Sequence, residues 1–179
     1  YALSPQAETI ALPAGARLCG FRLAPGTQVD TKALLQRTHA LDLDDGQQAM
    51  ALLADTCTLD ARVEESLQAL VHAPSVTQAA RSLGVSPRTL ERLLHRHTAH
   101  PPAFWRSLAR VRQTAHCLAA QPHWPLAEVA ALHHWADQPH MNLAFRHWLG
   151  CTPRQLQRDP QRLGLLLQSG YGDQGLFTP

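Results

Sequence analysis

The clearest hydrophobic pattern in the chain lies in residues 76–96. Its first half places apolar residues on one helical face and ends at Gly84, where a helix C-terminus favours a residue that tolerates positive φ. Ser86 then offers a side-chain oxygen to the first amides of a second helix, and Pro87 has the φ preset for a first helical position. Two short helices joined by a turn around a glycine predict a helix-turn-helix.

The second of these helices carries two different faces. Leucines point one way, whereas arginines recur at every fourth position on another face: Arg88, Arg92 and Arg96. Many helical hairpins share the apolar pattern alone. The basic face is therefore the feature that indicates DNA binding.

A related pattern follows. The periodicity predicts a long amphipathic helix over residues 103–120 and a second two-helix unit with its turn at residues 135–137. Asp137 is the expected N-cap of the later helix, and Thr152 that of a short helix over residues 153–158. The last 20 residues hold a Leu-rich turn and a Gly-rich end.

The first third of the chain reads differently. Short apolar runs at residues 8–12 and 17–23, separated by Pro/Gly turn signals, predict two strands, which we interpret as the end of a larger β domain. Helices are predicted over residues 31–41 and 46–56, with a third over residues 62–72 capped by Asp60. These helices suit bundle packing or dimerisation.

Charge divides the chain in the same way. Residues 74–158 carry ten arginines and three carboxylates, a net charge of +7, whereas residues 1–73 carry a net charge of −4. This asymmetry indicates two modules, of which only the basic one attracts a polyanion, although a solvated charged surface would look similar. The predicted domains are residues 1–73, a partial sensor and dimerisation region; residues 74–158, a DNA-binding domain; and residues 159–179, a tail.

Composition excludes several function classes. The four cysteines form no CxxC pair and indicate reduced thiols in a cytoplasmic protein. No apolar run has the roughly 20 residues that a membrane span needs, and no signal peptide is visible. No constellation of nucleophile and base or of paired carboxylates supports an enzyme, and no cofactor is expected. The chain starts at Tyr1 rather than Met, so we expect residues to precede it.

The histidines and tryptophans admit other interpretations. Neither His95, His97 and His100 nor His133 and His134 have metal-ligand spacing, so no metal is expected, and solvated or phosphate-facing rings are favoured. The four tryptophans could stack on single-stranded nucleic acid, but their apolar positions favour a place in the core.

The combination of motifs resembles the AraC/XylS family of bacterial transcription regulators. The resemblance lies in SPRTLERLL (86–94), Arg110-Val111, LAEVAAL (126–132), ADQPHMNLAFR (136–146) and GCTPRQL (150–156). It implies a mainly α fold: two helix-turn-helix units joined by a long linker helix, preceded by a short β remnant and a helical dimerisation and linker region. It also implies major-groove binding of double-stranded DNA, a small-molecule effector acting through the N-terminal region, a homodimer, and contact with RNA polymerase as an activator.

The family's DNA-facing positions correspond to two sets of residues. Arginine pairs with guanine edges, glutamine and asparagine suit adenine, and glutamate accepts from cytosine or orders a neighbouring arginine. Arg96, Arg110, Arg112 and Arg146 are better suited to phosphates. The predicted DNA-binding residues are Arg88, Thr89, Glu91, Arg92, Arg96, Arg110, Arg112, Gln138, His140, Asn142 and Arg146.

Three departures from the family bear on the two units. Leu143 stands where the family usually has arginine, and His134 and Ala99 stand where it usually has glycine. A β-carbon at positive φ costs about 1 kcal/mol, so both turns are expected to differ in geometry. The first unit is then expected to dominate affinity. The alternative is a protein-interaction or anti-activator module on an eroded scaffold.

Overall fold

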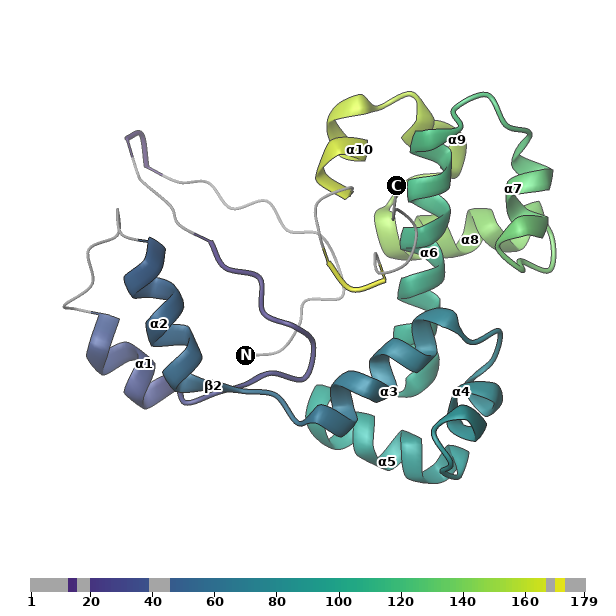
Figure 1. Cartoon of the computed structure of the whole chain (residues 1–179). Coiled ribbons are helices and arrows are strands. Elements are labelled where there is room, and N and C mark those ends of the chain that lie inside the picture. The colour runs from purple at the N-terminus through teal and green to yellow at the C-terminus, as the bar shows by residue number, and fades with distance from the viewer. Residues whose placement is uncertain (1–12, 16–19, 39–45, 167–169, 173–179) are drawn as a thin grey trace.

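The computed structural model describes residues 13–15, 20–38, 46–166 and 170–172. The fold is mainly helical, as the sequence predicts, with one small sheet among the described residues (Figure 1). The elements in chain order are β1 (Gln28–Val29), α1 (Thr31–Thr38), α2 (Gly46–Thr56), β2 (Cys57–Thr58), α3 (Ala61–His72), α4 (Val76–Ser82), α5 (Pro87–Thr98), α6 (Pro102–Ala120), α7 (Leu126–Leu132), α8 (Gln138–Leu149), α9 (Pro153–Gln157) and α10 (Pro160–Leu166).

Helix α6 is the long linker predicted from the sequence, and each of its halves belongs to a different core. The first core joins the N-terminal half of α6 to α3, α4 and α5 through residues such as Leu67, Leu90 and Trp105. The second joins its C-terminal half to α7, α8 and α9 through residues such as Leu118 and Phe145. Pairs α4–α5 and α7–α8 are the two helix-turn-helix units, and we call them the first and second unit.

The helix starts follow the predicted capping chemistry. The side chains of Ser86 and Asp137 accept from the third amide of α5 and α8, respectively, and Thr152 forms a capping box on α9. Asp60 caps α3 as predicted, accepting from the Arg62 amide. Hydrogen bonds from the side chain and the amide of Arg62 lower the pKa of Asp60 to about 2.

Two segments outside residues 74–158 pack into the first core. Three α3 residues, Val63, Leu67 and Leu70, are buried there. Tyr171 also packs against it, and its hydroxyl donates to the Leu67 carbonyl at 3.1 Å. Burial raises the pKa of this phenol. The predicted boundary at residues 73/74 thus separates α3 from the core that it helps to form, so we propose that the folded DNA-binding unit starts at α3.

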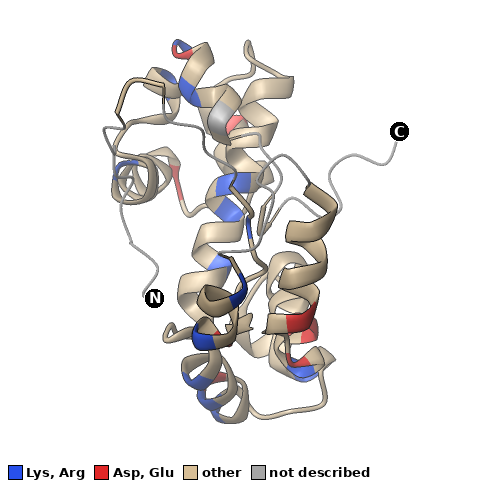
Figure 2. Ribbon diagram, turned by 90° about the vertical axis from the view of Figure 1, so that its left-hand side faces the viewer, with Lys and Arg blue, Asp and Glu red and all other residues tan. Residues whose placement is uncertain are grey.

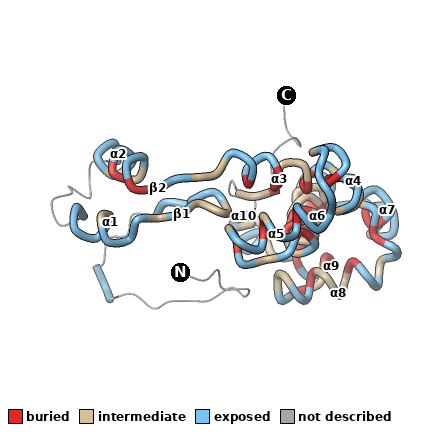
Figure 3. The backbone as a smooth tube through the Cα atoms, turned by 90° about the horizontal axis from the view of Figure 1, so that it is seen from below, coloured by how far each residue is buried: buried red, intermediate tan, exposed pale blue. Residues whose placement is uncertain are grey.

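The N-terminal part departs most from the prediction. Residues 20–23, part of a predicted strand, form no strand, and the run at 8–12 lies outside the described residues. Strands β1 and β2 instead pair antiparallel over two residues each, and α1 and α2 lie between them in the chain. A turn at Pro25-Gly26 precedes β1, with Gly26 at φ +85°. Helices α1 and α2 pack on each other and stand apart from the other helices (Figures 1 and 3).

Candidate DNA-binding surface

The polar face of α5 is open to solvent. Its leucines Leu90 and Leu94 are 1% and 0% exposed, which fixes the helix against the first core. The opposite side leaves five predicted residues exposed: Arg88, Thr89, Glu91, Arg92 and Arg96. Basic positions recur along α5, the lowest helix in Figure 2. No apolar core covers these guanidinium groups, so the first unit presents a basic edge that a DNA groove can reach.

The N-terminal end of this edge is rigid. The Thr89 amide donates to the Ser86 hydroxyl at 3.1 Å, and the two hydroxyl groups lie 2.8 Å apart. Thr89 is therefore part of the helix cap as well as part of the exposed face. The cap therefore holds the backbone at the start of α5, beside Arg88.

Helix α8 offers a less basic face. His140 and Arg146 are exposed, whereas Gln138 and Asn142 are half-buried. The Asn142 Oδ1 atom is buried without a hydrogen-bond partner, and the Leu143 side chain is 64% exposed. The second unit therefore presents one arginine and one large apolar residue where the first presents three arginines.

Both turns keep the geometry that glycine usually supplies. Ala99, which ends α5, and His134, in the turn between α7 and α8, each have φ of 58°. The equivalent positions in the other unit are Gly150 and Gly84, at 66° and 67°. The expectation of altered turns at Ala99 and His134 is wrong, because the surrounding hydrogen bonds hold both residues in the left-handed region despite the β-carbon.

The arginines of α6 point in two directions. Arg106 donates to the carbonyls of Ala73 and Pro74, and Arg110 NH1 donates to the His134 carbonyl at 2.9 Å. A side chain placed at Gly170 would meet the Arg112 guanidinium, so Arg112 lies beside the C-terminal segment. Sequence reasoning assigned phosphate binding to Arg110 and Arg112 alike, but the structure brings neither onto the α5 face.

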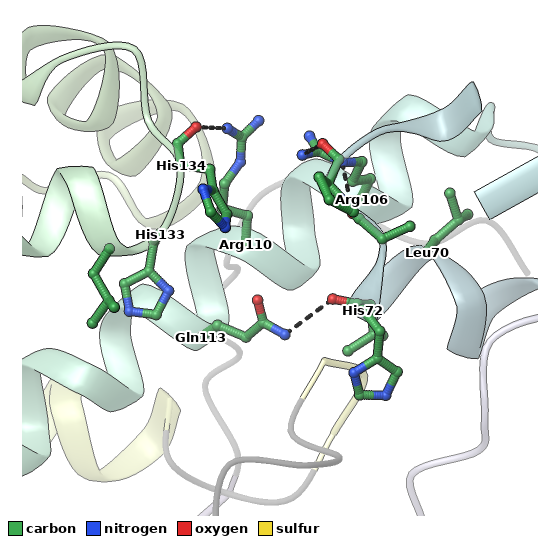
Figure 4. A pocket seen from close by; sticks show the side chains of 11 residues that line it. Leu70, His72, Arg106, Arg110, Gln113, His133 and His134 are labelled. Atoms are coloured by element: carbon green, nitrogen blue, oxygen red, sulfur yellow. Dashed lines mark hydrogen bonds between the residues drawn. The ribbon is translucent and has the colours of Figure 1, made fainter. Parts of the chain in front are cut away.

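One face of α6 lines a cleft of about 220 Å³, together with the end of α3 and the α7–α8 turn (Figure 4). Arg106, Arg110 and Gln113 contribute from α6, at spacings of four and three residues. His72 lines it from the end of α3, and His133 lines it from the end of α7. Sequence reasoning missed this site, although the spacing of Arg106, Arg110 and Gln113 places them on one helical face.

The environment of the cleft favours the neutral forms of the basic side chains that line it. Burial, then the neighbouring Arg106, lowers the pKa of Arg110, and burial lowers that of Arg106. Burial, then the charge of His134, lowers the pKa of His133. Gln113 Nε2 donates to the Val71 carbonyl at 3.2 Å and so ties α6 to the end of α3.

The tryptophans divide between core and surface. Trp105 and Trp135 are buried, and their indole N–H groups donate to Thr98 and Thr114, respectively. Trp148 is half-buried and donates to Ser107. Trp124 is 41% exposed, so its predicted core position is wrong: it lies in the short connection that follows α6. Among the described cysteines, Cys57, Cys117 and Cys151 are free thiols.

None of the helices among the described residues is long and apolar enough to cross a membrane. No group of three histidine, cysteine or carboxylate side chains in that part of the chain is arranged to hold a metal ion.

Two helix-turn-helix units on one linker helix, the first with an exposed arginine edge, define a double helix-turn-helix DNA-binding domain of transcription regulators. Residues 79–159 match a family model described as "Helix-turn-helix domain". This part of the chain, which is less than half of its length, is similar to that helix-turn-helix family. Comparisons with curated proteins and with solved structures gave no match.

Proposed function

We propose that the chain is a sequence-specific regulator that reads the major groove of double-stranded DNA with α5 and α8, and that α5 supplies most of the affinity. The observation that carries the proposal is the exposed basic edge of α5. Three arginines one turn apart, fixed by a buried leucine face, can enter a groove without any rearrangement of the core.

Each residue of α5 has a role that follows from its chemistry. Arg88 and Arg92 pair with guanine O6 and N7, and Arg96, at the C-terminal end, neutralises a phosphate. Glu91 accepts from cytosine N4 or orders the adjacent Arg92. Thr89 holds the helix start and donates to the backbone of the DNA.

Helix α8 contributes fewer contacts. Gln138 and Asn142 suit adenine edges, His140 lies in the first turn, and Arg146 contacts a phosphate. Leu143 packs against a thymine methyl group. The half-buried Gln138 and Asn142 and the single exposed arginine support the weaker role that we assign to this unit.

The region before α3 is proposed to regulate the DNA-binding domain. Leu35 on α1 and Met50 on α2 are 56% and 55% exposed, which supports a dimerisation surface on this helix pair. A small-molecule effector would act through the same region. Contact with RNA polymerase is the proposed route to activation.

One observation favours a second candidate, a protein-interaction or anti-activator module. The exposed Leu143 gives the recognition helix of the second unit an apolar surface that a protein partner could cover. The left-handed turn at His134 weakens this candidate, because the helix-turn-helix geometry is preserved there.

Fluorescence anisotropy with the duplex upstream of the gene, at two salt concentrations, separates the candidates. A regulator shows affinity that falls steeply with salt and exceeds its affinity for random duplex. Weak, sequence-independent binding would support the interaction module. In the same assay Arg92→Ala should weaken binding much more than Arg146→Ala, and equal losses would contradict the dominance of the first unit.

A further inference from the structure

The cleft between the C-terminal end of α3 and the α7–α8 turn, called here the inter-unit cleft, is lined by several basic side chains. Its lining includes Arg106, Arg110, His72, His133 and His134. None of the described residues that line it is an aspartate or a glutamate. Burial lowers the pKa of Arg110 and of His133, and the neighbouring charges of Arg106 and His134, respectively, lower the two values further.

Hydrogen bonding in the cleft is incomplete. Arg110 Nε and His133 Nε2 are buried side-chain atoms that lack a partner. Within the described part of the chain, Arg106 and Arg110 hydrogen-bond to backbone carbonyls and not to carboxylates. Buried polar atoms in a folded protein nearly always have a hydrogen-bond partner. Two unpaired nitrogen atoms in residues that line this cleft therefore point to a ligand with acceptor atoms.

The frame around the cleft is fixed. The carbonyls that hold Arg106 belong to the α3–α4 connection, and the carbonyl that holds Arg110 belongs to the α7–α8 turn. Arg110 also lies over the Trp135 ring, 4.2 Å from its centroid. Figure 4 shows Arg106 and Arg110 on one helix, with His133 and His72 on opposite sides of Gln113. The two guanidinium groups are thus anchored by part of their N–H groups, which leaves other donors for a ligand.

We propose that the inter-unit cleft binds a phosphate group through Arg106, Arg110 and His133. A tetrahedral oxyanion accepts several charge-assisted hydrogen bonds at once, and arginine forks match its geometry. The cavity of about 220 Å³ is large enough for one such group. The phosphate comes either from the DNA backbone between the two groove segments or from free phosphate. The assignment of the phosphate to the DNA backbone rests on the function proposed above, whereas the existence of a phosphate site does not.

The first arm of the test uses inorganic phosphate without DNA. Histidine ring signals are followed by NMR while phosphate replaces chloride at constant ionic strength. We expect saturable shifts for His72, His133 and His134, and no saturable shift for the exposed His123. His133→Leu and Arg106→Gln should each weaken the apparent phosphate affinity about tenfold or more, because each removes a charge-assisted or buried donor.

The matched control is Arg154→Gln, which removes the same charge from an exposed position on α9 and should leave the phosphate titration unchanged. Arg106 also holds the α3–α4 connection, so Arg106→Gln could unfold the first unit. In that case the phosphate titration of His133→Leu, followed by the ring signals of His72 and His134, tests the proposal. Linear shifts of equal size for cleft histidines and His123 would overturn the proposal, as would an unchanged affinity in His133→Leu.

The second arm adds a duplex selected from a random pool for binding to the protein. Shifts of the cleft histidines on duplex addition, together with loss of the phosphate titration, assign the site to the DNA backbone. A bound duplex that leaves the phosphate titration intact assigns it to free phosphate. A saturable phosphate site in a protein that binds no duplex would refute the proposed function and leave the site standing. The absence of saturable shifts with either ligand would refute the site.

Discussion

The guanidinium carbon of Arg110 lies 4.2 Å from the centre of the Trp135 ring. The same side chain donates to the carbonyl of His134, the residue next to Trp135. One residue of the linker helix therefore holds both the backbone and the aromatic ring of the turn that leads into α8. This contact therefore links α6 to the turn that precedes α8.

Replacing Arg110 with alanine should therefore destabilise the second unit. A cation–π contact contributes about 0.5–2 kcal/mol and a charged hydrogen bond about 1.5–3 kcal/mol, so we expect a loss of about 2 kcal/mol in the free energy of unfolding. Urea unfolding followed by tryptophan fluorescence measures this loss. Arg154→Ala, at an exposed position, should change stability by less than about 0.5 kcal/mol; a similar loss in both variants would show that the contact has no specific role.

Glycine should stabilise the two strained turns. Ala99 and His134 hold φ of 58°, where a β-carbon costs about 1 kcal/mol, so Ala99→Gly and His134→Gly should each raise the free energy of unfolding by about that amount. Thermal or urea unfolding gives the values. Gly84→Ala and Gly150→Ala are the reciprocal controls, because no atom lies within 4 Å of the added Cβ and backbone strain alone should destabilise them. If the two glycine variants were less stable than the wild type, the packing of the Ala99 and His134 side chains would outweigh the backbone strain at these positions.

Acid should destabilise the protein partly through His133. Burial and the charge of His134 lower its pKa in the folded state, so the unfolded chain takes up a proton first as pH falls below 6.5. Stability contributed by the neutral ring is present above pH 6.5 and declines below it, until the folded form is protonated too. Between pH 7.5 and 5.5 the wild type should lose more stability than His133→Gln, as urea midpoints would show. Parallel pH profiles would contradict the lowered pKa.

An arginine at position 143 should add a phosphate contact. Leu143 is exposed on α8, so Leu143→Arg places a new cation on the recognition face without disturbing the core. We expect tighter binding to duplex and a slope of log affinity against log salt that is steeper by about 0.9, the value for one more neutralised phosphate. Leu143→Gln, which is polar but uncharged, should leave the slope unchanged. An unaltered slope in Leu143→Arg would place this face away from DNA.

Local signals in the sequence predicted much of this fold. The caps at Ser86, Asp60, Asp137 and Thr152 and the turn at Gly84 depend on a few neighbouring residues, and all are present. Long-range packing was not predictable in the same way. Tyr171 contacts Leu67 across more than half of the chain, and no periodicity reports such a contact. The two-residue strands β1 and β2 are too short to leave any alternation.

The candidate site divides along the same line. The exposure of Arg88, Arg92 and Arg96 follows from helical spacing alone, and the structure shows it. The partners of Arg106 and Arg110 are backbone carbonyls on other elements, which a pattern of side chains does not reveal. For the same reason the left-handed turn at His134 was not foreseen: its geometry is set by neighbours rather than by its own preference.

Guanine methylation interference tests the central claim, major-groove readout by the arginine edge of α5, most directly. Methylation at N7 blocks arginine at that base from the major groove. With wild-type protein and its selected duplex, we expect interference at one or more guanines, and in Arg92→Ala the interference at one of these should disappear. The same interference pattern in wild type and in both Arg88→Ala and Arg92→Ala would contradict readout by this edge.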